Sequence, residues 1–205
     1  MARQCYFCEQ PIIDVETRLF DSFTCHSCQL NLQPTFQLLP DMPNIEIGGY
    51  FYVYSDQIRR MIRDIKFHGN MLLAKRFSNY IQTIPVPDVF FDSDVVVPIS
   101  THWFLQFWRG RAHIPLMFQQ LLLSCDRVEP KLLKRTRYSK SSFKLSKLDR
   151  MRVSKRFDWR GGDEIRSVTL IDDICTTGST VIEIARLLND CGVGAIRVLV
   201  GAYVE

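Results

Sequence analysis

The sequence has no long hydrophobic run, and this absence excludes a large class of proteins. No apolar stretch among its 205 residues approaches the length needed to cross a bilayer. The first residues, Met1 to Cys5, lack the apolar core of a secretory signal peptide. Internal repeats and low-complexity tracts are also absent. These absences predict a cytoplasmic globular protein that inserts into no membrane.

The composition is ordinary for a globular chain, but the charge is unevenly distributed. Hydrophobic residues make up 46% and charged residues 23%, which is sufficient for a sizeable core. The net charge of +4 conceals a basic segment, residues 127–160, with half of the 26 Lys and Arg residues and three of the 22 acids. Such a segment is either a solvated mobile loop or a binding site for polyanions such as pyrophosphate and nucleic acid.

Four cysteines form two Cys-x2-Cys pairs near the start of the chain. Cys5 and Cys8 form the first pair, and Cys25 and Cys28 form the second after sixteen intervening residues. This spacing is typical of a tetrahedral four-thiolate zinc site. A pair of disulfides is the alternative, which a cytoplasmic setting disfavours. Because about forty residues cannot form a core alone, we expect zinc to fold this segment.

The stretch VTLIDDICTTGST, residues 168–180, predicts a strand, a loop and a helix. The β-rich apolar run Val168–Ile171 indicates a buried parallel strand. Apolar residues then recur at helical spacing, with Ser179 or Thr180 as the expected cap and Gly192 as the end. The loop would lie at the carboxyl end of a parallel strand, where open α/β sheets bind ligands.

The residues of this expected loop favour a sugar phosphate as the ligand. Gly178 lets the backbone approach a ligand closely, and the N–H groups at the start of a helix favour a phosphate. Two neighbouring carboxylates, Asp172 and Asp173, would repel that phosphate unless they face sugar hydroxyls or a divalent metal. We expect both carboxylates on the solvent-facing loop, and the combination suggests a ribose 5-phosphate. The alternative is a strand end followed by a polar turn and a capped helix.

The complete thirteen-residue pattern resembles the phosphoribosyl pyrophosphate (PRPP) motif of the type I phosphoribosyltransferases. The resemblance implies that Asp172 and Asp173 contact the ribose hydroxyls and that Mg²⁺ binds together with PRPP. It also implies that the following residues bind the 5-phosphate: Cys175, Thr176, Thr177, Gly178, Ser179 and Thr180. The 6-oxopurine salvage branch carries an aspartate at the position of Thr176, so a hypoxanthine–guanine salvage role is disfavoured.

The remaining segments predict an α/β fold, with a parallel sheet flanked by helices. A strand-like aromatic run, GYFYVY, precedes an amphipathic helix between Ser55 and Gly69, and a second amphipathic stretch covers residues 71–81. Residues 94–100 (DVVVPIS) indicate the first buried strand of the sheet, and residues 195–204 indicate its last. Strands alternate with helices in this part of the chain, as in α/β proteins.

The four-cysteine segment and the stretch YSDQIRRMIRDIKFHG, ahead of such a motif, together resemble the ComF family of competence proteins. This family is required for natural transformation in many bacteria. The resemblance covers nearly the whole chain and implies a zinc ribbon at residues 1–40 and a phosphoribosyltransferase-like domain at residues 45–205. Within that domain, residues 45–90 would form an accessory or hood segment and residues 92–205 the core, with the basic segment 127–160 as a mobile loop.

The resemblance also suggests which residues meet pyrophosphate. Ser100 and Arg109 are the candidates on the sheet side. Arg109 and Gly110 agree with the family's pattern, whereas the next three positions, ending at His113, differ from it. The basic loop supplies the candidate lid over pyrophosphate: Lys134, Arg135, Arg137 and Arg150.

Three functions are compatible with these features. The first is a PRPP-binding protein of the ComF type that handles incoming single-stranded DNA in the cytoplasm during natural transformation. The second is an active phosphoribosyltransferase on a nucleobase or a nucleotide-metabolism substrate, and the third is a zinc-ribbon adapter to other competence proteins. A glutamine-hydrolysing enzyme is disfavoured, because Cys5 already belongs to a zinc knuckle. The aromatic run Trp103–Trp108 either packs against the sheet or stacks exposed bases.

Overall fold

The computed structural model describes residues 4–12, 24–99, 113–135 and 156–205. Its central sheet is formed by β1 (Gln37–Leu38), β2 (Ile47–Val53), β3 (Val95–Pro98), β6 (Ser167–Cys175) and β7 (Ala195–Tyr203). The strand order is β1-β2-β7-β6-β3. The short edge strand β1 is antiparallel to β2, and all other neighbours in this sheet run parallel. The predicted α/β class with a parallel-dominated sheet is therefore confirmed.

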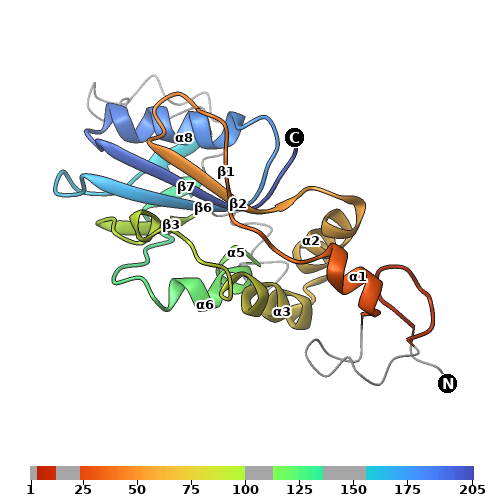
Figure 1. Ribbon diagram of the computed structural model, residues 1–205. Coiled ribbons are helices and arrows are strands. Elements are labelled where there is room, and N and C mark those ends of the chain that lie inside the picture. Colours follow the sequence, from red (N-terminus) through yellow and green to blue (C-terminus); the bar gives the residue numbers. More distant parts are fainter. Residues whose placement is uncertain (1–3, 13–23, 100–112, 136–155) are drawn as a thin grey trace.

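Helices cover both faces of the sheet (Figure 1). One face packs against α8 (Ser179–Asp190) and a ribbon made of β4 (Leu133–Arg135) and β5 (Phe157–Trp159). The other face is covered by α2 (Asp56–His68), α3 (Met71–Ile81), α5 (His113–Met117) and α6 (Gln119–Leu122), with the 3₁₀ turn η3 (Asp88–Phe90) beside them. Side chains alternate across β6, so that Leu170 enters the core under α8 and Ile171 enters the opposite core.

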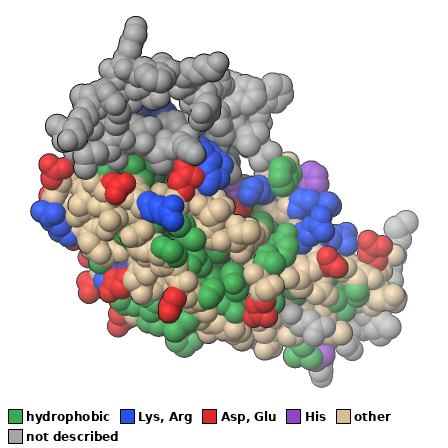
Figure 2. Space-filling view, turned by 90° about the horizontal axis from the view of Figure 1, so that it is seen from above, with side chains coloured by type: hydrophobic (Ala, Val, Ile, Leu, Met, Phe, Trp, Pro, Cys, Tyr) green, Lys and Arg blue, Asp and Glu red, His purple; other side chains and the backbone are tan. Residues whose placement is uncertain are grey.

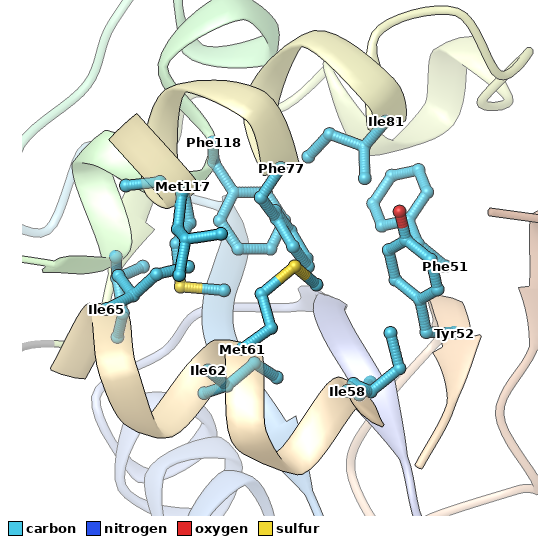
Figure 3. Close-up of a cluster of buried hydrophobic side chains, with 14 of the residues drawn as sticks. Phe51, Tyr52, Ile58, Met61, Ile62, Ile65, Phe77, Ile81, Met117 and Phe118 are labelled. Atoms are coloured by element: carbon cyan, nitrogen blue, oxygen red, sulfur yellow. The ribbon is translucent and has the colours of Figure 1, made fainter. Parts of the chain in front are cut away.

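The helix α2 forms where local signals predict it. The hydroxyl of Ser55 accepts a hydrogen bond from the Ile58 N–H at 3.3 Å, and Gly69 ends the helix in the left-handed conformation with φ 64°. Four apolar residues at helical spacing are buried: Ile58, Met61, Ile62 and Ile65. Figure 3 shows these side chains packed with Phe77 and Phe118. Burial of each contributes roughly 1.5–3 kcal/mol, which anchors α2 to the core.

The N-terminal segment lies against the end of the molecule that carries α2 and α3 (Figure 1). The first cysteine knuckle, the turn that carries Cys5 and Cys8, closes with a hydrogen bond from the Cys5 N–H to the Gln10 carbonyl at 2.8 Å. The short helix α1 (His26–Asn31) begins after Cys25. Among the described residues, we find no helix with the length and apolar character of a membrane span.

Candidate functional site

The acidic pair lies within strand β6, three and two residues before its end. Pairing with β7 continues past both acids, with Asp172 opposite Val200 and Cys175 opposite Tyr203. Asp173 is only 4% exposed. Our prediction of a solvent-facing loop was therefore wrong, because hydrogen bonds to β7 extend the strand through the acidic residues.

Two side chains from the helices α2 and α5, which cover the sheet face opposite α8, contact the carboxylate of Asp173. Lys66 Nζ, in the last turn of α2, lies 2.6 Å from Asp173 Oδ2, and His113 Nε2, at the start of α5, lies 2.9 Å from the same oxygen. Burial alone would raise the pKa of Asp173, but hydrogen bonds and attraction from His113 and Lys66 outweigh it and lower the pKa to about 2. Asp173 is therefore ionised at neutral pH.

Asp172 has the opposite electrostatic behaviour. Its Oδ1 accepts a hydrogen bond from the Asp173 N–H at 2.8 Å, and its side chain is half-buried. Burial and the neighbouring charge of Asp173 raise its pKa well above the ordinary value. The pKa values of the two adjacent carboxylates are thus shifted in opposite directions, which is common where titratable groups bind a ligand.

The loop after β6 is open to solvent and leads directly into α8. Thr176 and Thr177 are exposed, and the Ser179 N–H lies 3.4 Å from Thr177 Oγ1. The helix cap is Gly178, with φ 71° and no side-chain cap, so the predicted capping by Ser179 or Thr180 was wrong. The cap position requires a left-handed backbone, which glycine adopts most readily. Apart from this contact of Thr177, no side chain among the described residues is recorded as capping the first N–H groups of α8, and these groups could bind an anion.

The other predicted site residues are partly buried, partly exposed and partly outside the described residues. The Cys175 thiol is buried in the core under α8, where burial raises its pKa, so this residue could meet a ligand only through its backbone. Lys134 is exposed on β4, and Arg135 lies over the ring of Phe157 at 5.5 Å. Several others lie outside the described residues: Ser100, Arg109, Arg137, Arg150 and the aromatic run Trp103–Trp108.

Within the basic segment, the residues that flank positions 136–155 lie beside α8. The ribbon pairs Arg135 with Phe157, which brings together the residues on either side of residues 136–155. Arg156 Nε lies 2.5 Å from Glu183 Oε2 of α8, and the Arg156 N–H donates to the other carboxylate oxygen at 3.0 Å. The described ends of the basic segment are thereby fixed near the first turns of α8.

The four N-terminal cysteines converge. Their sulfur atoms all lie within 4.8 Å of one another, and Cys8 Sγ is 3.6 Å from Cys25 Sγ. That separation exceeds a disulfide bond of about 2.05 Å. Zinc–sulfur bonds of about 2.3 Å in a tetrahedron place the sulfurs about 3.8 Å apart, so these residues fit a zinc ion. Cys5 and Cys28 are buried, as expected for a structural site.

The first cysteine knuckle contacts α2 through polar groups. The Tyr6 hydroxyl donates to Asp64 Oδ2, and the Arg60 guanidinium lies over the Tyr6 ring at 4.8 Å. Arg60 also pairs with Glu9 at 3.5 Å. Since Lys66 is two residues beyond Asp64, a single helix contacts both the cysteine cluster and Asp173.

Sequence reasoning missed Lys66 and His113 as members of this site. Lys66 is 107 residues from Asp173 in the chain, and His113 is 60 residues from it. No spacing rule connects positions so far apart. His113 falls where the chain departs from the ComF pattern, and that departure was the one local signal pointing to it.

The structure is that of an α/β protein with a parallel-dominated sheet and a four-cysteine module, and its β6–α8 motif resembles the PRPP motif of the type I phosphoribosyltransferases. The curated "Competence protein F" of Haemophilus influenzae is 33% identical over 179 residues, which cover 85% of this chain and 76% of that protein. The chain therefore belongs to the competence protein F (ComF) family. No family model matches the sequence.

The chain also resembles solved structures, one of which is the adenine phosphoribosyl transferase from Trypanosoma brucei in complex with AMP, pyrophosphate and ribose-5-phosphate. The match covers 82% of this chain and 87% of that one, with 12% identity and a TM-score of 0.37. This resemblance is too weak to transfer any of those ligands to the present chain.

Proposed function

We propose that the chain is a PRPP-binding protein that handles incoming single-stranded DNA in the cytoplasm during natural transformation. The observation that carries this proposal is the junction of β6 and α8. There an acidic pair is separated by two residues from the exposed Thr176 and Thr177, which lead through the buried Gly178 into the N-terminus of a twelve-residue helix. Carboxylates suited to sugar hydroxyls thus adjoin N–H groups suited to a phosphate.

Each part of PRPP has a proposed contact. Backbone N–H groups and hydroxyls of residues 176–180 would bind the 5-phosphate. The ribose hydroxyls would donate to Asp172 and to Asp173 Oδ1, because both Lys66 and His113 occupy the other oxygen, Oδ2. The carboxylates offer hard oxygen ligands that suit Mg²⁺, which would supply charge neutralisation between the ribose hydroxyls and pyrophosphate.

The basic segment is proposed to serve two anions. Lys134, Arg135, Arg137 and Arg150 would cover pyrophosphate, with Ser100 and Arg109 opposite them, and the same loop would attract single-stranded DNA. The bonds of Arg156 to Glu183 support this proposal, since they anchor one end of the loop beside the proposed phosphate site. One set of cations serving both ligands would make PRPP and DNA compete or couple.

An active phosphoribosyltransferase is the second candidate, and the ionised state of Asp173 favours it. In this reaction, an acceptor forms a bond to the anomeric carbon of PRPP while the bond from that carbon to pyrophosphate breaks. Positive charge develops on the ribose in the oxocarbenium-like transition state. A fixed negative carboxylate beside the ribose would stabilise that charge. Release of pyrophosphate from PRPP with added nucleobases or DNA is the diagnostic measurement.

Calorimetric titration with PRPP, with and without Mg²⁺, tests the binding proposal. Each hydrogen bond to a charged group contributes about 1.5–3 kcal/mol, so Asp172→Ala with Asp173→Ala should weaken binding by at least about a hundredfold. Asp173 is buried, so Asp172→Asn provides a milder variant whose fold is verified by circular dichroism. Asp190→Asn, an exposed carboxyl at the far end of α8, is the matched control. Unchanged affinity in both site variants would refute the assignment.

A further inference from the structure

One side of α2 carries a basic and aromatic ridge, which we call the α2 ridge: Arg59, Arg63 and Phe67. These residues follow one another at intervals of four, so they share a side of the helix, away from its buried apolar residues. All three are exposed, Phe67 by 54%. Within the described part of the chain, no close ion pair is recorded for Arg59 or Arg63, although attraction from Arg63 helps to lower the pKa of Asp64.

The α2 ridge runs between the cysteine module and the acidic pair. Arg60, next to Arg59, contacts the first knuckle, and Lys66, next to Phe67, reaches Asp173. Figure 2 shows a face on which Lys and Arg side chains gather close to His and hydrophobic side chains. A chain-like ligand lying along α2 would therefore end beside the proposed PRPP site.

The charge of this region selects an anionic ligand. Residues 56–82 contain six Lys and Arg residues and two acids, Asp56 and Asp64. Of these cations, Lys66 pairs with Asp173 and Arg60 with Glu9, whereas Arg59, Arg63 and Lys75 are exposed. Asp64 is already engaged by Tyr6 and His68, and Asp56 lies in the first turn, before the ridge begins. A membrane surface is a poor occupant, since the apolar face of α2 is buried in the core and cannot enter lipid.

The exposed aromatic ring favours nucleic acid over an acidic peptide. Proteins that bind single strands combine a positive track with rings on which bases stack. Residues four apart on a helix are separated by about 6 Å along its axis, so two cations and one ring would meet successive units of an extended strand. An acidic peptide has no bases to stack on Phe67.

We propose that the α2 ridge binds single-stranded nucleic acid and leads it to the acidic pair. Arg59 and Arg63 contact phosphates, and Phe67 stacks on a base. This inference rests on the proposed function, but it assigns the DNA contact to α2 in addition to the basic loop. It also places the acceptor side of the proposed PRPP site at the end of α2, because the nucleic-acid strand would reach the site where Lys66 contacts Asp173.

Fluorescence anisotropy with a labelled oligothymidylate, measured over a series of salt concentrations, tests the proposal. Loss of each phosphate contact should make the log–log slope of affinity against salt shallower by about 0.7, so Arg59→Ala with Arg63→Ala should change it by about 1.4. Phe67→Leu should weaken binding at least about fivefold without changing the slope, because stacking involves no counterion. Phe67→Tyr keeps the ring and should retain binding.

Arg186→Ala removes an exposed arginine from α8, on the opposite face, and is expected to leave affinity and slope unchanged. The inference is overturned if the ridge variants bind with unchanged slope and affinity, or if polyglutamate of equal charge competes as well as the oligonucleotide. Calorimetry with PRPP on the same variants separates the two proposals. Ridge variants that lose DNA but keep PRPP support the inference, whereas loss of PRPP binding in the Asp172 variants tests the pocket alone.

Discussion

A buried carboxylate requires partners, and Asp173 has two. Lys66 and His113 reach it from different elements, and both contact the same oxygen. Removal of one partner leaves a buried charge with incomplete compensation, which is more costly than loss of an exposed ion pair. The stability of this part of the protein therefore depends on a residue that the motif alone would assign to ligand binding.

Lys66→Met tests this dependence at the level of one residue. We expect the free energy of unfolding at pH 7 to fall by about 1.5–3 kcal/mol, the contribution of a hydrogen bond to a charged group. Urea denaturation provides the measurement. Lys75→Met, an exposed lysine on α3, should change the same quantity by less than about 0.5 kcal/mol. Equal stability of the two variants would contradict the role of Lys66.

The effect of Lys66→Met should also depend on pH. The pKa of Asp173 in the folded protein, about 2, lies below its ordinary 3.8, so its ionisation stabilises the fold above about pH 4. That contribution is lost as the pH falls towards 2. The pKa of Asp172 is raised, so its contribution has the opposite sign and declines as the pH rises. The stability difference between wild type and Lys66→Met should therefore shrink as the pH falls from about 4 to about 2.

At the scale of elements, the connection between β6 and α8 depends on one glycine. Gly178 has a φ of 71°, and an added Cβ would lie 2.9 Å from Met42 Sδ. An L-residue in this left-handed conformation costs about 1–2 kcal/mol. Because the methionine sulfur can shift, the backbone conformation is the larger constraint.

Gly178→Ala is expected to lower the free energy of unfolding by about 1–2 kcal/mol and to weaken PRPP binding, since the loop and the first N–H groups of α8 would move. Gly194→Ala is the matched control. It has no positive φ, and the nearest atom to its added Cβ is the Arg166 carbonyl oxygen at 3.9 Å. Denaturation and calorimetry on both variants should separate them, and similar losses in the two would disprove the explanation.

At the scale of the whole molecule, α2 connects the cysteine module to the acidic pair. Tyr6 contacts Asp64, which is two residues before Lys66 on α2. The apolar face of the same helix packs in the core. A zinc-dependent module cannot retain its structure without its metal. Loss of the metal should therefore remove the contacts of Tyr6 and loosen α2 as well as the module.

Hydrogen exchange before and after chelation of zinc tests this connection. We expect one zinc per chain by elemental analysis, reduced in Cys25→Ser. After chelation, amide exchange should increase in the module and along α2 and remain unchanged in α8, which contacts the other core. Faster exchange confined to the module would contradict the connection, and absence of zinc from freshly purified protein would contradict the metal site.

Local patterns in the sequence were sufficient for several features of this protein. The helix between Ser55 and Gly69 follows from its cap, its apolar spacing and its terminal glycine, all within a few turns of each other. The stretch from Met71 to Ile81 was also predicted with its observed bounds. The paired cysteine spacing anticipated the convergence of four sulfur atoms. These features depend on residues close in the chain, where periodicity and spacing decide the structure.

Only the tertiary structure decided the environment of the acidic pair. The parallel partner β7 extends β6 through Asp172 and Asp173, and the folding of two helices over the sheet brings Lys66 and His113 to Asp173. The conformation of Gly178 likewise replaced the expected hydroxyl cap. Strand pairing and long-range ion pairs join residues that are distant in the chain, so no local pattern contains them. The contacts of Lys66 and His113 that separate the pKa of Asp173 from that of Asp172 exist only after the layers have packed.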